Sequence, residues 1–441
     1  MPASPADSAL YRHLFSDDEV AALFTDSAEV RALMLAEGTL AKVQGALGVI
    51  PETAAAFLHR ASFELQIDPA ALARETAVNG VPVPALVAAF RKATEAPEHA
   101  AYLHWGATSQ DIMDTALALR LRRMLFIFDT RLRSLIPALG TLARAHADLP
   151  MAARTYGQTA TPTSFGAVVA SWGRPLLRHH ARLGDVTAGV TQVSLSGAAG
   201  TLSAMGDKGP QVRAAMATAL GLTDPGASWH TERDGIAALA AWLAALTTSL
   251  AKMGEDLILL TQSGMDEVSI AGAGASSTMP QKQNPVGPSV LVAIARQAVA
   301  LSSVLQGATV HRQQRDGAAW FSEWLSLPQL CILSARALGL ACDLIPRLTP
   351  DATAMQRGLD AGNGVIFAEA LSFALSTQMP RPTAQAQVRD LCAQTAQGTH
   401  LLTLAARVWP GTDWATALRA DMLGQAPSEA RAFAEAARSL S

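Results

Sequence analysis

Apolar residues recur at spacings of three and four along most of the chain, as they do on the buried face of an amphipathic helix. Alanine and leucine, which favour helices, fill these stretches. Short alternating runs that suggest strands are "QVSLSG" (192–197) and "DEVSI" (266–270), both next to loops. The sequence therefore predicts an all-α protein. The long predicted helices cover residues 26–48, 111–148, 164–183, 229–262 and 286–310.

One helical stretch, "GIAALAAWLAALTTSLA" (235–251), carries no charge at all. Asp234 and Lys252 flank it closely, so it is barely long enough to cross a bilayer. We interpret it as a helix that is buried on nearly all sides. Since a small domain cannot easily enclose such a helix, we expect a bundle of long helices shared between subunits.

Breaks in the helical pattern divide the chain into three predicted regions. Residues 1–107 hold shorter helices, residues 108–347 hold the long helices, and residues 348–441 return to short ones. The expected architecture is a central long-helix bundle flanked by two smaller helical domains.

Composition and charge indicate which kinds of binding partner to expect. The 441 residues are 50% hydrophobic and 16% charged, with a formal net charge of −3. An average soluble domain is about 25% charged, so we expect much of the surface to be buried in an oligomer. Neither the net charge nor the isoelectric point of about 6.4 favours nucleic-acid or membrane-surface binding. The ten histidines and three cysteines lack metal-ligand spacings, so we predict no metal and no organic cofactor. The N-terminus lacks the features of a signal peptide, and we expect a cytoplasmic protein.

The loop "GAGASSTMPQKQNPVGP" (272–288) separates two apolar helical runs. A mobile linker would explain its glycines, but not Ser276, Ser277, Lys282 and Asn284 together. The third glycine of a dinucleotide-binding turn is missing. Bare N–H groups and a lysine suit a lid that closes over an anion and contributes a hydroxyl group.

Three further stretches gather polar residues near helix ends. In "HWGATSQD" (104–111), Thr108 and Asp111 form a capping box, and free hydroxyls at a helix N-terminus suit a carboxylate. "RTYGQTATPTSFG" (154–166) fits a helix-entry turn, and "HRQQRDG" (311–317) fits a solvated charge cluster. Each has this plain structural interpretation when it is taken alone.

Together, the TSQD helix start, the RT-x-x-Q turn and the "SSTMPQKQNP" loop resemble the fumarase/aspartase superfamily, in the expected order from about residue 80 to 330. Within it, the first two motifs and the chain length are most similar to the branch of cycloisomerases that act on carboxylated muconates. The alternatives are the adenylosuccinate lyases and C–N lyases of the same superfamily that act on an aspartate derivative. The resemblance implies a small polycarboxylate substrate and a homotetramer with active sites built from the motifs of separate subunits.

The resemblance and the local charges nominate the site residues. Ser276 matches the catalytic serine, and Lys282 acts with it. Substrate-binding candidates are Thr108, Ser109, Arg154, Thr155, Gln158, Met279 and Asn284. Further candidates are Tyr156, His104, Ser277, Arg312 and Arg315.

The second motif departs from the superfamily at Tyr156, where many members carry a histidine that protonates the leaving group. An amine or hydroxide leaves poorly without a proton, whereas a carboxylate, whose acid has a pKa of about 4, needs none. Tyr156 therefore favours lactone chemistry over the lyase alternatives. A non-catalytic scaffold of the same fold is a third hypothesis, disfavoured because Ser276, Lys282 and Asn284 are all present.

Overall fold

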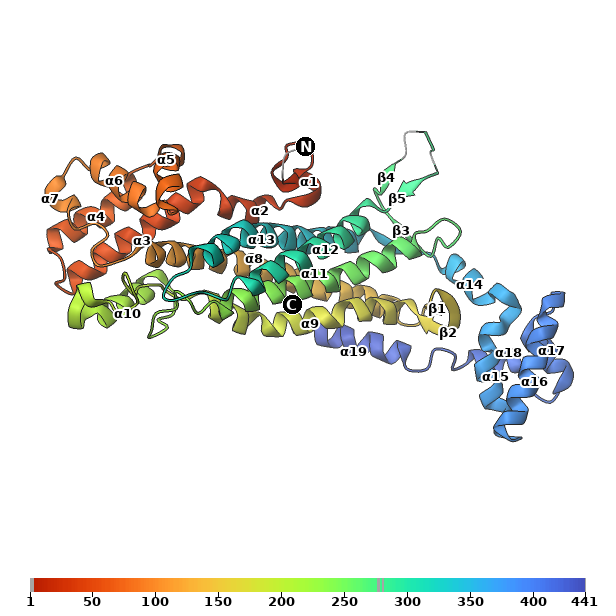
Figure 1. The fold of residues 1–441 in the computed structure, drawn as a ribbon. Coiled ribbons are helices and arrows are strands. Elements are labelled where there is room, and N and C mark those ends of the chain that lie inside the picture. Colours follow the sequence, from red (N-terminus) through yellow and green to blue (C-terminus); the bar gives the residue numbers. More distant parts are fainter. Residues whose placement is uncertain (1–3, 276–277, 280, 441) are drawn as a thin grey trace. The chain divides into compact units, whose positions relative to one another are not determined.

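The structure, a computed structural model, describes residues 4–275, 278–279 and 281–440. Most of this length is helical, with little strand (Figure 1), so the all-α prediction is confirmed. Among the described residues, the strands pair into three two-stranded antiparallel sheets. The long helices are α8 (Ser109–Ala145), α9 (Phe165–Val190), α11 (Asp234–Leu260), α12 (Val286–Gly307) and α13 (Gly317–Leu344).

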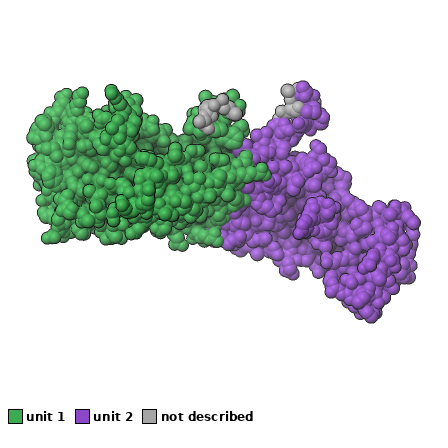
Figure 2. Space-filling model, viewed as in Figure 1, with its two compact units in different colours: residues 1–131, 179–248, 293–339 green, residues 132–178, 249–292, 340–441 purple. Residues whose placement is uncertain are grey.

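The contacts of the chain define two compact units, coloured separately in Figure 2. Unit 1 comprises Met1–Arg131, His179–Thr248 and Ala293–Gly339. Unit 2 comprises Leu132–Arg178, Ser249–Val292 and Leu340–Ser441. Each long helix contributes residues to both units. The division into regions 1–107, 108–347 and 348–441 stays a prediction.

Unit 1 packs its shorter helices around one apolar core, with Leu33, Leu58, Phe90, Ile112 and Val212 in its interior. Two glycines let α3 approach α4 closely: a Cβ atom at Gly38 would lie 1.9 Å from Ser62 Oγ, and one at Gly45 would lie 2.2 Å from Ala55 Cβ. The shorter helices of unit 1 are η1 (Pro5–Asp7), α1 (Arg12–Phe15), α2 (Asp18–Ala21), η2 (Ala22–Phe24), α3 (Asp26–Ala46), α4 (Glu52–Glu64), α5 (Pro69–Asn79), α6 (Val83–Ala93), α7 (Pro97–Ala100), η3 (Ser203–Lys208) and α10 (Gly209–Leu220).

Unit 2 holds the strands and a second core, which includes Phe367, Leu371, Leu391, Leu401 and Trp414. Its strands are β1 (Pro150–Thr155), β2 (Gln158–Ser164), β3 (Val268–Ile270), β4 (Gly274–Ala275), β5 (Gln283–Asn284) and β6 (Leu348–Pro350). Its shorter helices are η4 (Ile345–Arg347), α14 (Ala352–Asp360), η5 (Ala361–Phe367), α15 (Ala368–Leu375), α16 (Arg381–Gln394), η6 (Thr395–Gln397), α17 (Leu401–Val408), α18 (Trp414–Arg419) and α19 (Ala426–Arg438).

The predicted strands have different outcomes. "DEVSI" contains β3, which pairs with β6. "QVSLSG" was wrongly predicted, because this segment makes only an isolated bridge, between Gln192 and Thr223. Its N–H groups at Ser194 and Ser196 bond to the side chains of Thr115 and Asp111 instead of to a strand. The β1–β2 hairpin was not predicted, since Pro162 lies inside β2 and is tolerated only because a two-stranded sheet consists of edges.

Three helices of the described chain are long and apolar enough, by length and composition alone, to cross a membrane. They are Asp234–Leu260, Val286–Gly307 and Gly317–Arg347. More than half of the most apolar window of each is nevertheless buried against the rest of the chain, including 61% for Asp234–Leu260. The prediction that 235–251 is buried on nearly all sides is met only in part within the chain, because Ala238, Ala241 and Thr248 are exposed.

Candidate active site

The N-terminus of α8 presents Thr108 and Ser109, both half-buried, at the start of a 37-residue helix. The N–H group of Thr108 donates to Asp111 Oδ2 at 3.0 Å, which is the carboxylate half of the predicted capping box. The helix start therefore has a fixed conformation, and its dipole favours an anion at this end.

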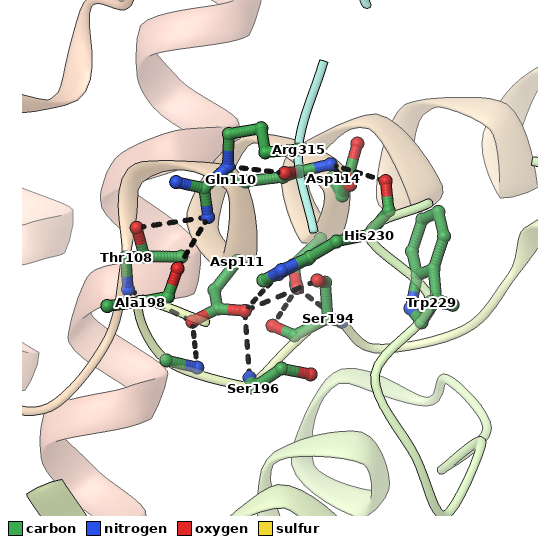
Figure 3. A network of polar contacts seen from close by, with 12 residues as sticks. Thr108, Gln110, Asp111, Asp114, Ser194, Ser196, Ala198, Trp229, His230 and Arg315 are labelled. Carbon is green, nitrogen blue, oxygen red and sulfur yellow. Dashed lines mark hydrogen bonds and ion pairs between the residues drawn. The ribbon is translucent and has the colours of Figure 1, made fainter. Parts of the chain in front are cut away.

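Asp111 holds a neighbouring loop against this helix start (Figure 3). Its side chain is fully buried and accepts hydrogen bonds from the N–H groups of Ser196 and Gly197 at 2.8 and 2.9 Å. His230 Nε2 lies 2.8 Å from Asp111 Oδ1. One carboxylate thus joins α8, the 192–200 loop and the segment before α11.

Arg315 reaches the same helix start from the segment between α12 and α13. Its Nε donates to Gln110 Oε1 at 2.8 Å, and its Nη2 lies 3.3 Å from Ala198 O and 3.5 Å from Thr108 Oγ1 (Figure 3). Arg312 instead pairs with Asp316, at 2.5 and 3.2 Å, and its side chain is 79% exposed. Of the two predicted arginines, the structure places only Arg315 beside Thr108.

Arg233, Asp114 and Glu323 form a buried ion cluster, and Asp114 accepts a hydrogen bond from Gln110. The guanidinium of Arg233 pairs with Asp114 at 2.9 and 3.2 Å and with Glu323 at 2.8 and 2.6 Å. All three side chains are at most 2% exposed. Burial alone would raise the pKa of each carboxyl group, and the pairing with Arg233 lowers the pKa of Glu323 below its usual range.

His104 lies in the turn before α8 with a left-handed backbone, at φ 64°. Its Nδ1 is 2.6 Å from Oε1 of Glu37, a side chain that is only 3% exposed. Burial lowers the pKa of His104, but the charge and hydrogen bond of Glu37 outweigh that effect and raise it above its ordinary value. Glu37 therefore favours the protonated form of this histidine, which lies in the turn that leads into α8.

The second motif forms the β1–β2 hairpin of unit 2. Thr155 and Gln158 are its last cross-strand pair, and Tyr156 and Gly157 form the turn with φ values of 52° and 75°. The Tyr156 side chain is fully exposed. Arg154 donates from both terminal nitrogens to Glu267, at 2.9 and 2.8 Å, and so ties the hairpin to the segment before β3.

Within the 272–288 loop, hereafter the signature loop, β4 and β5 form a small hairpin. Gly274 pairs with Asn284, and Ala275 pairs with Gln283. Lys282 is exposed, and Met279 is 40% exposed. The two predicted serines, Ser276 and Ser277, lie outside the described residues. A cavity of about 500 Å³ beside the hairpin is lined by Gln281 and Gln283 but also by Asp266 and Asp351, whose charges disfavour a polyanion there.

The predicted residues therefore form two groups, each ordered within its own unit. Thr108, Ser109, His104 and Arg315 belong to unit 1, whereas the hairpin and the signature loop belong to unit 2. Prediction missed Gln110, His230, Arg233, Glu323 and Glu37. Only Gln110 carried a local signal, since it stands inside the TSQD motif. Among the described residues, no group of three or more histidine, cysteine, aspartate or glutamate side chains could hold a metal ion.

Comparisons with known proteins define the class. Residues 16–300 match the profile of a lyase family. The chain belongs to this family, which lies in the fumarase/aspartase superfamily. It is 38% identical to the 3-carboxy-cis,cis-muconate cycloisomerase of Pseudomonas aeruginosa, over 88% of this chain and 86% of the relative.

A solved structure extends the similarity to the fold. The 3-carboxy-cis,cis-muconate lactonizing enzyme of Pseudomonas putida superposes with a TM-score of 0.93 and 33% identity, covering 98% of this chain and all of that one. The nitrosuccinate lyase of Streptomyces davaonensis is 34% identical over 90% of this chain and 87% of its own length. The family thus includes other named activities at similar identity.

Proposed function

We propose that this protein is a 3-carboxy-cis,cis-muconate cycloisomerase, which interconverts 3-carboxy-cis,cis-muconate and 4-carboxymuconolactone in protocatechuate catabolism. Full-length similarity to enzymes of that name supports the assignment. Within the chain, the observation that carries the assignment is the identity of residue 156. Tyr156 is exposed at the tip of the β1–β2 hairpin. Many superfamily members have a histidine at this position that protonates the leaving group.

The chemistry explains why that position matters. In lactone formation, a carboxylate oxygen of the substrate attacks the alkene while a proton is delivered to the neighbouring carbon. In the reverse direction, the proton leaves and the C–O bond breaks, so the leaving group is the substrate's own carboxylate. Because this group departs as a stable anion, no acid is needed at Tyr156. C–N lyases release an amine and do need one.

In this mechanism Ser276 transfers the proton, and Ser277 is the alternative hydroxyl. The intermediate places extra charge on the carboxylate next to the reacting carbon, and stabilising it requires cations and N–H donors. Lys282, Asn284 and Met279 would line the loop side of the substrate, with Thr155 and Gln158 from the hairpin. We propose that separate subunits contribute these motifs to one site, with Thr108, Ser109 and Arg315 binding a second carboxylate at the α8 N-terminus.

Two predicted roles find little support in the observed contacts. Arg154 is engaged by Glu267, and Arg312 by Asp316, so binding a substrate carboxylate would require each to exchange its present partner. His104 is bonded to Glu37 through Nδ1, so donating a proton from that atom to a substrate would likewise require it to exchange its partner.

We also propose a soluble, cytoplasmic homotetramer. Apolar side chains stay exposed on the long helices, among them Val299 (50%), Leu325 (71%) and Phe321 (42%). Packing long helices from several subunits into one bundle would bury them. Sedimentation at equilibrium tests this, and a monomeric mass at micromolar concentration would contradict it.

The test of function is the ultraviolet absorbance of 3-carboxy-cis,cis-muconate mixed with the native protein, Ser276→Ala and Ser277→Ala. We expect the diene signal to disappear with the native protein and Ser277→Ala, and the rate to fall about 10²–10⁴-fold in Ser276→Ala. Undiminished activity in Ser276→Ala would remove the serine assignment alone. If the native protein leaves the muconate intact but cleaves adenylosuccinate or an N-substituted aspartate, the lyase alternative replaces the proposal.

A further inference from the structure

The side-chain amide of Gln110 has only one orientation compatible with its neighbours. Its Nε2 donates to Asp114 Oδ2 at 3.2 Å and to the carbonyl oxygen of His230 at 2.9 Å (Figure 3). A backbone carbonyl can only accept, so the nitrogen must face this side. The Oε1 atom then faces Arg315, whose Nε can only donate. Flipping the amide would place two donors against each other and two acceptors against each other.

This amide is also buried beside groups that are themselves paired. Gln110 is fully buried, and Asp114 is held in turn by Arg233, itself fixed by Glu323. The amide oxygen is therefore positioned by a series of hydrogen bonds that runs from Glu323 through Arg233 and Asp114 to Gln110. Arg315, by contrast, is exposed to solvent. Its hydrogen bonds to Ala198 O and Thr108 Oγ1 are longer, at 3.3 and 3.5 Å.

We propose that Gln110 is a positioning residue that aims the guanidinium of Arg315 at a substrate carboxylate above the N-terminus of α8. The bond to Nε fixes the guanidinium plane, and a carboxylate would bind the terminal nitrogens in place of the longer Nη2 contacts to Ala198 O and Thr108 Oγ1. Without it, a long exposed side chain would sample many rotamers, and ordering it on binding would cost affinity. The inference rests on the proposed function, because Arg315 gains this partner only if a carboxylate binds there.

The test is a double-mutant cycle between Gln110→Met and Arg315→Ala. Methionine keeps the length of the side chain and removes the C=O and NH₂ of the amide. A carboxylate contact made in both the ground and transition states acts on KM more than on kcat. We expect Gln110→Met to raise KM about tenfold with kcat nearly unchanged. This is the change expected when one hydrogen bond to a charged group is lost. In the Arg315→Ala background, the same substitution should leave KM unchanged, because its target is gone.

Gln306→Met is a control for the loss of a glutamine amide, at an exposed residue of α12. Gln306 also donates from Nε2 to a backbone carbonyl of unit 1, Ala237 O at 2.9 Å, but touches no predicted site residue. It should lose stability without a change in KM. An equal effect of Gln110→Met in both Arg315 backgrounds, or none in the native background, would overturn the proposal and leave Gln110 as a packing residue.

Failure of the proposed function would look different. The native protein would then not consume the muconate, and the cycle would be run with whichever carboxylate substrate it does consume. A crystal structure of Gln110→Met adds a readout that needs no substrate. We expect the Arg315 guanidinium to leave its place beside Ala198 O, and an undisturbed guanidinium would contradict the inference.

Discussion

His230 Nε2 lies 2.8 Å from Asp111 Oδ1, and neither side chain is more than 3% exposed. The two residues are 119 positions apart in the sequence. Asp111 also caps the first turn of α8 and accepts two N–H groups of the 192–200 loop. This single carboxylate therefore holds the helix start at Thr108 and the loop whose Ala198 carbonyl oxygen lies beside Arg315.

Replacing Asp111 with asparagine should destabilise the protein by about 3 kcal/mol, because an NH₂ group would face N–H donors that have lost their charged acceptor. Urea unfolding measures the change in the free energy of unfolding. Asp148→Asn is the control, since that carboxylate is 70% exposed and pairs with Arg431 at the surface. Equal stabilities for the two variants would contradict the role given to Asp111.

Replacing Arg233 with methionine should cost about 3–5 kcal/mol at neutral pH, because Asp114 and Glu323 would be left buried without their cation. The loss should shrink as the pH falls. Burial raises the pKa of Asp114, so the folded variant binds a proton more readily than the unfolded chain, and that gain fades as the pH rises through the folded-state pKa. Unfolding at pH 5 and pH 8 tests the sign; a larger loss at pH 5 would contradict it.

Replacing Glu37 with glutamine should lower the pKa of His104. Because Glu37 raises that pKa on folding, its contribution to stability is complete below the unfolded value of about 6.5 and is lost as the pH rises through the folded value. Asp111 also raises the pKa of His104, and Arg91 opposes it. The variant should therefore lose more stability at pH 6 than at pH 9. Glu64→Gln, at an exposed glutamate, should show no such difference.

Replacing Tyr156 with phenylalanine should leave the rate of lactone formation within about threefold of the native rate, since a carboxylate leaving group needs no proton donor. The side chain is fully exposed at the hairpin turn, so the fold should not change. Steady-state kinetics in the lactone-opening direction give the sharpest measurement. A fall of about 100-fold or more would identify the phenol as the acid and weaken the argument for lactone chemistry.

The sequence allowed the long helices to be predicted well, because their periodic apolar faces are a local signal. The expected helix 26–48 is Asp26–Ala46 in the structure, and 286–310 is Val286–Gly307. The β1–β2 hairpin was missed because its strands lack apolar alternation and its turn uses Tyr156 at positive φ, where asparagine or glycine would have signalled it.

For the candidate site, prediction succeeded where the signal lay within a few residues and failed where it depended on tertiary contacts. Thr108 and Asp111 form the expected cap. Nothing in the local sequence distinguishes Arg315 from Arg312, although one reaches Gln110 and the other only Asp316. Arg233 is likewise surrounded by ordinary polar residues in the sequence, and its importance comes from partners about a hundred positions away.

The ion cluster also bears on how the protein folds. Asp114 and Arg233 are separated by 119 residues, and Arg233 and Glu323 by 90. Before α8, α11 and α13 dock, each of these charges is hydrated, so the cluster gives no early driving force. A shift of one of these helices by one turn, about 5.4 Å, would bury at least one charge unpaired. The cluster therefore destabilises misregistered packings of these helices, which an alanine- and leucine-rich interior alone would tolerate.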